Sequence, residues 1–496
     1  MLRIICYFPS MRILFVSSEV APFAKSGGLG DVSAALPRQL AAAGHDVRIV
    51  MPMYARVHDH GRTFTEVIPQ IAFDMGPHQI HVGVFAGELP GTRVPVYFVR
   101  CPALYDRRSI YGSGDDEHLR FGVLNWAALK ICQRLGFAPD IVHANDWQTA
   151  LLPVLLRSVF AWDRLFAGAR TVLTLHNLGH QGTFAAGAAL DVGLGPALEL
   201  LHQGELQAGR FGFLLTGLLH AHALTTVSRT YAAEIQTPQH GVGLDPYLRA
   251  RHDSLFGILN GIDDQEWHPA VDVHLPHRYS IDDLSGKARC KAALQEGMHL
   301  PDAPDVPVIG VVSRLVWQKG FDLCLGVLPH LLRRRSAQLV VLGTGEHRYE
   351  AFFHQLARAF PRQVAYQSAF SEPRAHLIEA GADLFLMPSR YEPCGLNQLY
   401  SLRYGTPPIV HRTGGLADSV WPYDADADRG TGFVFDHFTE VGLYWALNHA
   451  LDHWGQRDEA GRARWLALQR RGMALPLGWQ HRVGEYLEVY RRASAG

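Results

Sequence analysis

The chain has 496 residues, 48% of them hydrophobic, and its 46 Lys and Arg residues nearly balance its 47 Asp and Glu residues. This length exceeds what one hydrophobic core usually supports, so two large domains are expected. The balanced charge argues against a broad surface for nucleic acids, and no apolar run reaches the ~20 residues that span a bilayer. We therefore expect neither a nucleic-acid partner nor a membrane partner.

The six cysteines are widely separated in the sequence, and no two of them form a Cys-x-x-Cys pair. This spacing is typical of reduced thiols in a cytosolic protein, not of a disulfide framework or a metal motif. It predicts a cytoplasmic protein that needs no metal. Residues 1–10 are too short and too broken for a signal peptide, and we interpret them as an N-terminal extension ahead of a start at Met11.

In the first half, apolar runs of strand length alternate with helical stretches, a pattern that predicts βαβ units and a parallel sheet. Pro37 removes one hydrogen bond from the helix expected at 31–43, but Asp31 can cap its start, so the helix is retained. The predicted strands cover residues 12–17, 47–51, 95–99, 140–143, 171–175 and 224–227, and helices are expected at 31–43, 117–135 and 146–157.

Turn-forming residues crowd the segment 257–278, which predicts a linker, and a second βα series follows it. We therefore expect one α/β domain at 11–262, a second at 263–475, and a C-terminal helix at 476–496 that packs on either domain. Two such sheets predict a cleft at their strand ends. The strands of the second domain are predicted at 307–312, 338–342, 363–366, 383–387, 408–411 and 432–435.

The most informative segment is 388–396, Pro-Ser-Arg-Tyr-Glu-Pro-Cys-Gly-Leu, which follows the predicted strand 383–387. Glu392 therefore lies past the carboxyl end of a strand, where open parallel sheets bind ligands. Its carboxylate can hold sugar hydroxyls. The amides of Cys394, Gly395 and Leu396, where the next helix begins, can bind a phosphate. One loop thus offers contacts to both halves of a sugar nucleotide.

Two cations in the same predicted sheet, Arg314 and Lys319, occupy the turn after strand 307–312. Both can reach one diphosphate, the arginine as a bidentate fork and the lysine as a point charge. A solvated basic loop would explain them equally well if they stood alone, and the Glu392 loop favours the phosphate. Glycine turns at 343–345 and at Thr413-Gly414 could also lie beside a nucleotide, although tight turns alone would explain them.

Three candidates follow strands of the first half. Lys25, Gly27 and Gly28 lie between a strand and a helix and predict an anion site, although the loop matches neither the dinucleotide fingerprint nor a Walker loop. Asp146 follows strand 140–143, where a simple helix N-cap is the stronger explanation. His176 follows strand 171–175 beside Asn177, and these neighbours favour hydroxyl binding over a purely structural histidine.

Together these motifs resemble the bacterial and plant glycogen and starch synthases, glycosyltransferase family 5, which use ADP-glucose. The similarity begins at Met11 and covers nearly the whole chain. It implies a GT-B fold, in which two Rossmann-like domains face each other across a deep interdomain cleft and the C-terminal helix returns to the first domain. The motifs that carry it lie at 25–32, 143–147, 174–177, 313–320, 389–400 and 412–418.

The resemblance implies retaining transfer of glucose from ADP-glucose to the non-reducing end of an α-1,4-glucan, such as glycogen or malto-oligosaccharides, with release of ADP and no metal cofactor. It implies that Glu392 acts at the transferred glucose, that Arg314 and Lys319 clamp the diphosphate, and that His176 holds the glucose 6-hydroxyl. The implied catalytic residues are Glu392, His176, Asp146, Arg314 and Lys319. The implied donor-binding residues are Lys25, Gly27, Gly28, Asn177, Arg314, Lys319, Tyr366 (stacked on adenine), Glu392, Cys394, Gly395, Leu396, Thr413 and Gly414.

The chain departs from the family pattern at two places. Ser26 replaces a common Thr and keeps the hydroxyl, and Gly179-His180 replaces a common Ala-Tyr, so no role is carried over for that tyrosine. Three other hypotheses stay open. The chain could be a GT-B transferase that uses UDP-glucose, a glycoside hydrolase with Asp146 and Glu392 as its carboxylate pair, or a non-catalytic glucan-binding protein. The hydrolase hypothesis leaves the basic pair and the glycine loops unexplained.

Overall fold

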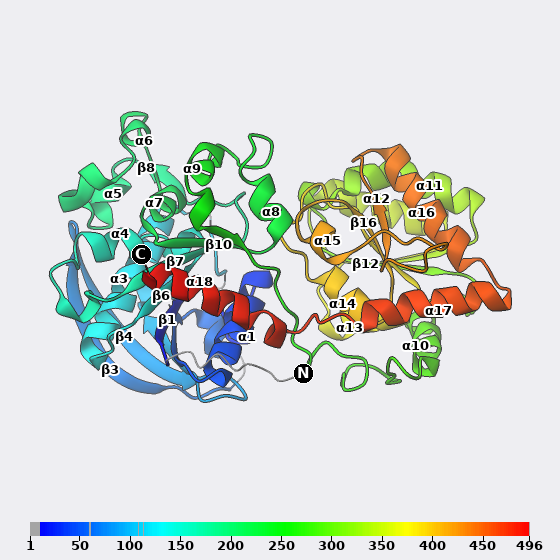
Figure 1. Ribbon diagram of the computed structural model, residues 1–496, viewed down its shortest axis with the longest axis horizontal. Coiled ribbons are helices and arrows are strands. Elements are labelled where there is room, and N and C mark those ends of the chain that lie inside the picture. The colour runs from blue at the N-terminus through cyan, green and yellow to red at the C-terminus, as the bar shows by residue number, and fades with distance from the viewer. Residues whose placement is uncertain (1–9, 59–60, 108, 113, 496) are drawn as a thin grey trace. The chain divides into compact units, whose positions relative to one another are not determined.

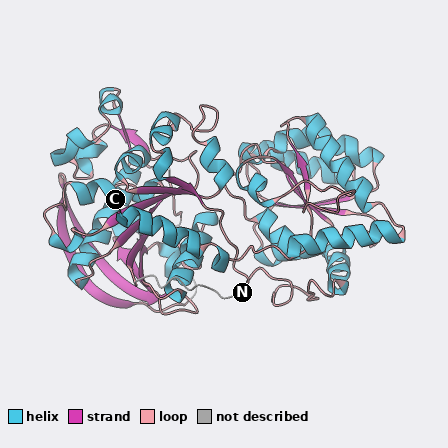
Figure 2. Ribbon diagram, viewed as in Figure 1, coloured by secondary structure: helices cyan, strands magenta, loops and turns pink. Residues whose placement is uncertain are grey.

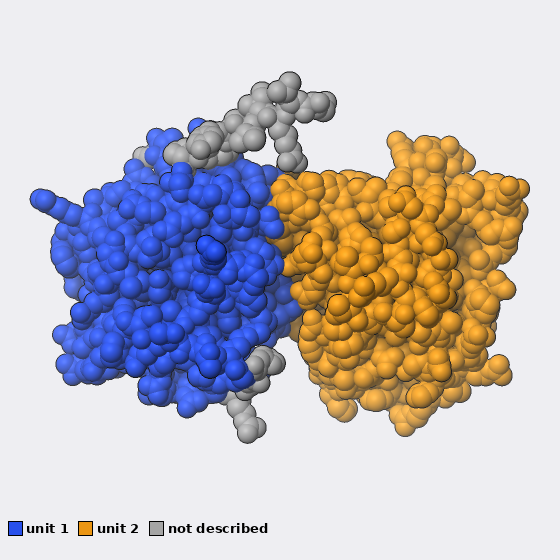
Figure 3. Space-filling model, turned by 90° about the horizontal axis from the view of Figure 1, so that it is seen from below, with its two compact units in different colours: residues 1–227, 232–258, 482–496 blue, residues 228–231, 259–481 orange. Residues whose placement is uncertain are grey.

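The computed structural model describes residues 10–58, 61–107, 109–112 and 114–495. All but the last residue of the proposed N-terminal extension 1–10 therefore lie outside the described residues. The chain divides into two compact units, which Figure 3 distinguishes by colour. Unit 1 comprises residues 1–227, 232–258 and 482–496, and unit 2 comprises residues 228–231 and 259–481. In each unit, helices cover a central set of strands (Figure 2).

The main sheet of unit 1 has nine strands in the order β11-β10-β7-β6-β1-β2-β5-β4-β3 (Figure 1). The seven strands from β11 to β5 are parallel, as the alternation of strands and helices predicts. The strands are β1 (Arg12–Val16), β2 (Asp46–Pro52), β3 (Thr65–Met75), β4 (His78–Glu88), β5 (Pro95–Arg100), β6 (Ile141–Asn145), β7 (Arg170–Leu175), β10 (Ala223–Thr226) and β11 (Leu255–Gly257), and a separate pair is formed by β8 (Thr183–Ala185) and β9 (Arg210–Gly212).

The expectation of a purely parallel sheet in unit 1 is wrong at one edge. There β3 and β4 form a long antiparallel hairpin, and β4 also pairs antiparallel with β5. Most residues of β3 are exposed or half-buried, so the segment lacks the continuous apolar run that marks a buried parallel strand. The hairpin extends the sheet without changing the order of its parallel strands.

The helices of unit 1 lie in the connections between its strands. The first of them begins earlier than the sequence predicted. Helix α1 begins at Gly28, so Asp31 lies in its first turn and does not cap it, whereas Pro37 is accommodated inside the helix as expected. The helices are α1 (Gly28–Ala42), α2 (Pro102–Tyr105), α3 (Glu117–Leu135), α4 (Leu152–Arg157), α5 (Ala188–Asp191), α6 (Gln203–Gln207), α7 (Phe213–His220), α8 (Arg229–Glu234, whose first residues belong to unit 2), α9 (Asp245–Ala250) and α18 (Val483–Ala495).

The C-terminal helix packs on unit 1. Helix α18 begins at Val483, so the predicted helix 476–496 is too long at its start. In Figure 1 the helix, drawn in red, lies beside β7, and it contacts β7 and β10. The hydroxyl of the buried Tyr490 lies 2.7 Å from Nδ1 of His143 on β6, and Nε2 of His143 lies 2.6 Å from the Thr174 hydroxyl. Burial lowers the pKa of His143 to about 3, so this link is formed by a neutral imidazole.

The sheet of unit 2 has six parallel strands in the order β14-β13-β12-β15-β16-β17, which is 3-2-1-4-5-6 in chain order. This is the strand order of a dinucleotide-binding Rossmann sheet. Its strands are β12 (Val308–Val312), β13 (Gln338–Leu342), β14 (Val364–Gln367), β15 (Leu384–Met387), β16 (Pro408–His411) and β17 (Phe433–Phe435), and each lies within one residue of its predicted ends.

Successive residues of these strands point into two different cores, as strand geometry requires. On one face, alternate strand residues pack with helices α11, α12 and α16. On the other face, the intervening residues pack with α10, α13, α14 and α15. The helices of unit 2 are α10 (Ser285–Gly297), α11 (Phe321–Arg334), α12 (His347–Ala359), α13 (Glu372–Gly381), α14 (Asn397–Arg403), α15 (Gly414–Ser419), α16 (Glu440–Trp454) and α17 (Glu459–Met473).

Within the described ranges, no helix combines the length and the low polarity needed to cross a membrane. The five cysteines in these ranges are buried free thiols. Residues 228–231 join unit 2 through specific hydrogen bonds: the Ser228 hydroxyl donates to the carbonyl of Pro393 (2.6 Å), and the Thr230 amide donates to Asp418 (3.0 Å).

Candidate active site

The candidate residues of unit 2 lie where the strand order of its sheet reverses. Strands β12 and β15 are hydrogen-bonded neighbours, but they are first and fourth in the chain. The helix after β12 covers one face of the sheet and the helix after β15 covers the other, so the two connecting loops, 313–320 and 388–396, diverge from the same sheet edge. Open α/β sheets bind ligands at such a point.

Lys319 and Glu392 come together at this point. The Lys319 ammonium lies 2.6 Å from Oε2 of Glu392, and the Ser389 hydroxyl donates to the same oxygen at 2.9 Å. The side chains of Lys319 and Glu392 are 19% and 7% exposed, respectively. A pair this little exposed is weakly screened, so each charge fixes the position of the other. The sequence suggested that both residues lie near one ligand, but it did not reveal this direct contact.

Backbone-to-backbone packing holds the two loops together. The Arg390 amide donates to the carbonyl of Gln318 at 2.9 Å. Gly320 has φ 72°, and a Cβ there would lie 1.9 Å from the carbonyl oxygen of Pro388. Only glycine fits a position that combines this backbone conformation with so close an approach. The spacing between Lys319 and Glu392 is therefore set by rigid backbone contacts.

The loop around Thr413 and Gly414 packs on the other side of the Glu392 loop. The Gly415 amide donates to the carbonyl of Glu392 at 3.0 Å. Gly414 has φ 42°, and a Cβ there would lie 2.0 Å from the same carbonyl oxygen. The sequence left two explanations for Gly414, a phosphate contact or a tight turn. The structure gives it a packing role beneath Glu392, while buried Thr413 precedes α15.

Arg314 differs from Lys319 in its surroundings. It is exposed, and no described residue forms a hydrogen bond or an ion pair with its guanidinium. Both Arg314 and Glu392 influence the neighbouring Tyr391. Burial raises the pKa of Tyr391, the negative charge of Glu392 raises it further, and the positive charge of Arg314 lowers it. Arg314 therefore lies near the Glu392 loop with its donors available to a ligand.

The segment after Glu392 supplies further donors. Helix α14 begins at Asn397, so Gly395 and Leu396 lie just before its first turn. In the part of the chain that the structure describes, no hydrogen bond is made by the backbone amides of Gly395 and Leu396. Gln398 donates from its side chain to the carbonyls of Cys394 and Gly395, both at 3.0 Å. This fixes the carbonyls and leaves the two amides for an anion.

Tyr366 lies on β14, two strands away from β12. Its hydroxyl donates to the carbonyl of Gly343 at 3.0 Å, and its ring meets those of Phe353 and His354 on α12 edge-on or tilted. These contacts fix the ring at the Gly343 turn. The stacking of Tyr366 on adenine stays a prediction.

The candidates of unit 1 lie at the corresponding point of its sheet. Strands β1 and β6 are neighbours, and the strand order reverses between them. Asp146, directly after β6, has φ 55° and ψ −174°, a backbone conformation that is strained for any residue except glycine. Such strain persists only where surrounding contacts enforce it, and it clusters at functional sites.

Asp146 does not cap a helix, in contrast to the explanation that its position favoured. A 3₁₀ turn (η2, Trp147–Thr149) and then α4 replace the single helix predicted at 146–157, and the carboxylate is not bonded to the start of that turn. Instead Oδ1 accepts the His176 amide at 2.6 Å. Burial raises the pKa of Asp146 to about 7, although bonds from the His176 and Asn177 amides favour the ionised form. The side chain thus joins the ends of β6 and β7.

His176 lies beside Asp146 at the end of β7. Its Nε2 lies 3.1 Å from Oδ1 of Asn145, and burial lowers its pKa to about 3. The imidazole is therefore neutral at physiological pH. Donation from Nε2 to the amide oxygen leaves Nδ1 as an acceptor, which suits a sugar hydroxyl. Asn177 accepts the Gly179 amide at 3.0 Å and so shapes the following turn.

The loop with Lys25, Gly27 and Gly28 contains a residue that the sequence analysis missed. The buried carboxylate of Glu19 accepts the Ser26 hydroxyl at 2.7 Å, the amides of Ser26 and Gly27, and the Tyr111 hydroxyl. The Ser26 and Gly27 amides of the predicted anion site are therefore already bonded to the Glu19 carboxylate. Glu19 follows β1 at the sheet reversal, and this position was the signal that could have identified it.

Lys25 and Gly27 in this loop are not enclosed by other residues, so a ligand can reach them. Lys25 is 39% exposed and pairs with Asp31 of α1 at 2.6 Å. A Cβ at Gly27 would meet nothing within 4 Å. The loop can thus lie against a ligand at Gly27 while Glu19 fixes its shape from behind.

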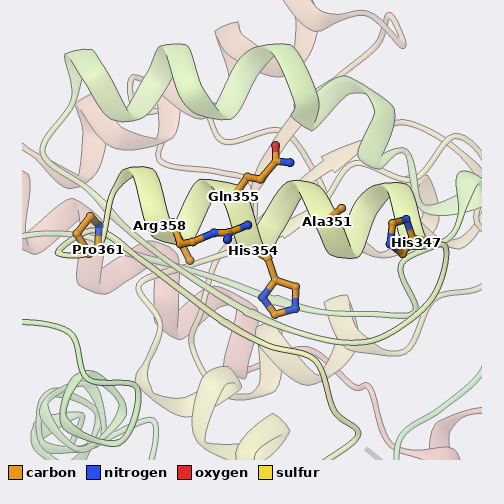
Figure 4. A pocket seen from close by; sticks show the side chains of 7 residues that line it. His347, Ala351, His354, Gln355, Arg358 and Pro361 are labelled. Atoms are coloured by element: carbon orange, nitrogen blue, oxygen red, sulfur yellow. The ribbon is translucent and has the colours of Figure 1, made fainter.

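An open hollow lies along α12, and none of the candidate residues lines it. It is lined by residues of that helix and by Pro361 beyond its end (Figure 4). His354 and Gln355 project from the helix in opposite directions in this view. Because polar groups do not converge there, the hollow lacks the usual character of a binding site.

Comparison with family models agrees with the division into two units. Residues 12–250 match the starch synthase catalytic domain, and residues 300–464 match the glycosyl transferases group 1 family. The chain is 48% identical over 495 residues to a glycogen synthase from Anaeromyxobacter sp. (strain Fw109-5), covering 98% of this chain and 100% of that protein. It is 44% identical over 488 residues to a glycogen synthase from Syntrophotalea carbinolica, with 97% and 99% coverage.

Solved structures show the same similarity in three dimensions. The catalytic domain of starch synthase IV from Arabidopsis thaliana, bound to ADP and acarbose, superposes with a TM-score of 0.88 at 32% identity, covering 98% of this chain and 100% of that one. A sucrose-phosphate synthase from Thermosynechococcus elongatus superposes with a TM-score of 0.59 at 16% identity, covering 98% and 99%, which is a likeness of fold alone.

Proposed function

The chain belongs to the glycogen and starch synthase family of glycosyltransferases and has the GT-B fold, and from this we propose that it transfers glucose from ADP-glucose to the non-reducing end of an α-1,4-glucan, with retention of anomeric configuration and release of ADP. Full-length similarity to glycogen synthases supports the reaction. The ADP and acarbose bound to the plant relative support a nucleotide donor and a glucan acceptor. Glycogen and malto-oligosaccharides are the proposed acceptors.

The observation that carries this proposal is the Lys319–Glu392 pair at the strand-order reversal of unit 2. In our proposal Lys319 and Arg314 bind the diphosphate, while Glu392 binds the transferred glucose. The pair supports this division because the two charges lie 2.6 Å apart, so one ligand can meet the cation with its phosphate and the carboxylate with its adjoining sugar. The amides of Gly395 and Leu396 supply further donors to phosphate oxygens.

Transfer breaks the bond between the anomeric carbon and a phosphate oxygen. The departing ADP gains negative charge, and the glucose gains oxocarbenium character. Fixed cations stabilise the first and a fixed carboxylate stabilises the second, and each preorganised contact of this kind is worth about 3 kcal/mol of barrier. In our proposal the rigid loops around Gly320 and Gly414 provide that preorganisation, because their charged groups need no rearrangement during the reaction.

We assign the residues of unit 1 to the glucose and to the donor. Neutral His176 accepts the 6-hydroxyl through Nδ1, and Asp146 holds the His176 and Asn177 amides in place. Lys25, Gly27 and Gly28 contact the donor, with Glu19 fixing their loop. The strain at Asp146 and the hydrogen bonds of His176 support these roles.

We further propose that the transfer needs no metal, because Arg314 and Lys319 provide the positive charge that a divalent cation supplies to other nucleotide-sugar enzymes. A cytoplasmic location fits the buried free thiols and the ADP-glucose donor, and it belongs to the same proposal. The hydrolase and non-catalytic hypotheses gain no support from the family match, whereas UDP-glucose remains the alternative donor to be tested.

The test is a donor assay with the purified full chain. The protein is incubated with glycogen and either ADP-glucose or UDP-glucose, in chelator and without divalent metal, and both nucleoside diphosphate release and glucose incorporation are measured. We expect ADP and incorporated glucose in equal amounts, with ADP-glucose preferred. Preference for UDP-glucose would replace the proposed donor. Glucan binding without ADP release, or glucose release without a nucleotide, would contradict glucosyl transfer.

A further inference from the structure

Three potential metal ligands meet in unit 2 at a place that the proposed transfer does not use. One ligand atom each from His274, Glu372 and His376 lies within 4.8 Å of the others. His274 belongs to the irregular segment after residue 268, whereas the other two belong to α13. None of the proposed donor residues takes part in the cluster. His274 is about 100 positions away from the other two in the chain, so no local sequence motif contains all three.

His376 is the anchor of the cluster. Its side chain is fully buried, and its Nδ1 lies 2.8 Å from Oδ2 of Asp272. No described residue offers a hydrogen-bond partner to its buried Nε2. A buried polar atom without a partner is costly, and it calls for an explanation such as an ion. Because Asp272 accepts from Nδ1, a neutral His376 presents the lone pair of Nε2.

The Asp272–His376 contact matches the outer shell of known metal sites. A ligating histidine almost always donates its second ring N–H to a carboxylate or carbonyl, which fixes its tautomer and orientation. Asp272 also accepts the Tyr404 hydroxyl and the His274 amide. The carboxylate thus bonds to both histidine-bearing segments and fixes the position of the His376 ring.

Aromatic stacking fixes the ring plane of His376. The Trp267 ring stacks on His376 with centroids 3.7 Å apart and planes 15° apart, and Tyr400 stacks on Trp267 at 3.8 Å and 10°. The His274 ring centroid lies 4.7 Å from that of His376. Ligands with restricted orientation lose little entropy on binding an ion, so this ring is prepared for coordination.

The other two ligands have the freedom to complete the site. Glu372 lies one helical turn before His376, so both side chains project from the same face of α13. Glu372 is exposed and His274 is half-buried. Tetrahedral zinc with bonds of 2.0–2.2 Å places its ligand atoms about 3.4 Å apart. Closing the gap from 4.8 Å needs a shift of roughly 1.5 Å, which an exposed glutamate makes by changing rotamer.

We propose that His274, Glu372 and His376 bind one Zn²⁺ ion, with water in the fourth position. Two imidazoles and one carboxylate suit zinc, whereas calcium and magnesium favour oxygen ligands throughout. The ion ties the segment that carries Asp272 and His274 to α13, so its effect is on the stability of unit 2. This site qualifies the sequence-based expectation of a protein without metal, and it is independent of the transferase activity.

The experiment uses untagged full-length protein, stripped with chelator and titrated with ZnSO₄. Bound zinc is counted after desalting, and the thermal unfolding midpoint Tm is recorded at each concentration. We expect one bound equivalent at this site and a rise in Tm of roughly 5 °C at a 100-fold excess over Kd. His274→Ala and Glu372→Ala each remove that equivalent and the rise, while Tm without zinc stays close to that of the wild type.

A matched control separates this site from surface histidines. His449 and His453 lie one turn apart on α16, with ring centroids 4.6 Å apart, and such a pair also attracts zinc. His449→Ala should leave the equivalent and the Tm rise intact. The proposal is overturned if the wild type binds no zinc, if both cluster variants keep the rise, or if His449→Ala removes it. The cluster variants avoid His376, whose replacement disturbs the buried core.

Discussion

The ammonium of Lys319 and the carboxylate of Glu392 lie 2.6 Å apart, and they come from two loops that leave neighbouring strands of one sheet. Main-chain contacts at Gly320 and Gly414 hold both loops, so the spacing of the two charges is a property of the fold.

Glu392→Gln should lower kcat by about 10²–10³, with a much smaller change in KM for ADP-glucose. Glutamine keeps the size of the side chain and can still accept from the Ser389 hydroxyl, so mainly the charge is lost. Steady-state kinetics measure the effect. Glu488→Gln, which changes a partly exposed carboxylate paired with Arg491 on α18, is the control. An equal loss through KM alone would show that Glu392 only binds the donor.

Arg314→Ala should weaken kcat/KM for ADP-glucose by about 1.5–3 kcal/mol, the range for a hydrogen bond to a charged group. Tm should stay unchanged, because no described residue pairs with this guanidinium. Kinetics and thermal unfolding are measured on the same preparation, with Arg334→Ala, an exposed arginine at the end of α11, as the matched control. A fall in Tm with unchanged kcat/KM would assign Arg314 to the fold and not to the donor.

Lys319→Ala should abolish activity while the protein still folds. It leaves Glu392 as an unpaired and nearly buried charge, so Tm should fall. Adding Glu392→Gln to Lys319→Ala removes that charge, and Tm should then rise again while activity stays absent. Recovery of activity in the double variant would contradict the roles of both residues. A double variant no more stable than Lys319→Ala would contradict the coupling seen in the structure.

Asp146 should make the protein less stable as pH rises. Burial raises its pKa to about 7 in the folded state, against about 3.9 in an unfolded chain. Between these two pKa values the folded state binds one more proton than the unfolded chain. The stabilisation from this group is therefore complete below about pH 4 and decreases as the pH rises from about 4 to 7. Asp146→Asn lacks this titration. The difference in Tm, variant minus wild type, should therefore grow from pH 5 to pH 8, and a constant difference would refute the raised pKa.

His176 should act through the 6-hydroxyl of glucose. His176→Ala and the donor ADP-6-deoxyglucose should each lower kcat/KM, by about 1–2 kcal/mol for one neutral hydrogen bond. Their combination should cost no more than either change alone, because both remove the same contact. Fully additive losses would place the 6-hydroxyl elsewhere. His252→Ala, which changes an exposed histidine of unit 1, is the control.

Strand prediction succeeded wherever a buried parallel strand produces a continuous apolar run. All six strands of unit 2 lie within one residue of their predicted positions, because β12 and β15 are buried on both faces. The hairpin of β3 and β4 was not predicted, because its exposed outer strand β3 mixes polar with apolar residues and lacks a continuous apolar run. The strand order, and with it the two reversal points, became visible only in three dimensions.

The candidate site was predictable as a set of positions but not as a set of contacts. Glu392, Lys319 and His176 each follow a strand, which the sequence reveals. The strained backbone of Asp146 depends on contacts with residues far along the chain, such as His176. The bonds from the Ser26 and Gly27 amides to Glu19 depend on how the loop folds back on itself, which local patterns do not encode. The same holds for His274 and His376, which meet only because α13 packs beside the segment after residue 268.

The most direct test of the account is a crystal structure of the protein with ADP. We predict that the diphosphate contacts the guanidinium of Arg314 and the ammonium of Lys319, with the amides of Gly395 and Leu396 at its oxygens and Glu392 turned toward the position of the glucose. A diphosphate bound away from Arg314 and Lys319 would contradict the proposed donor site.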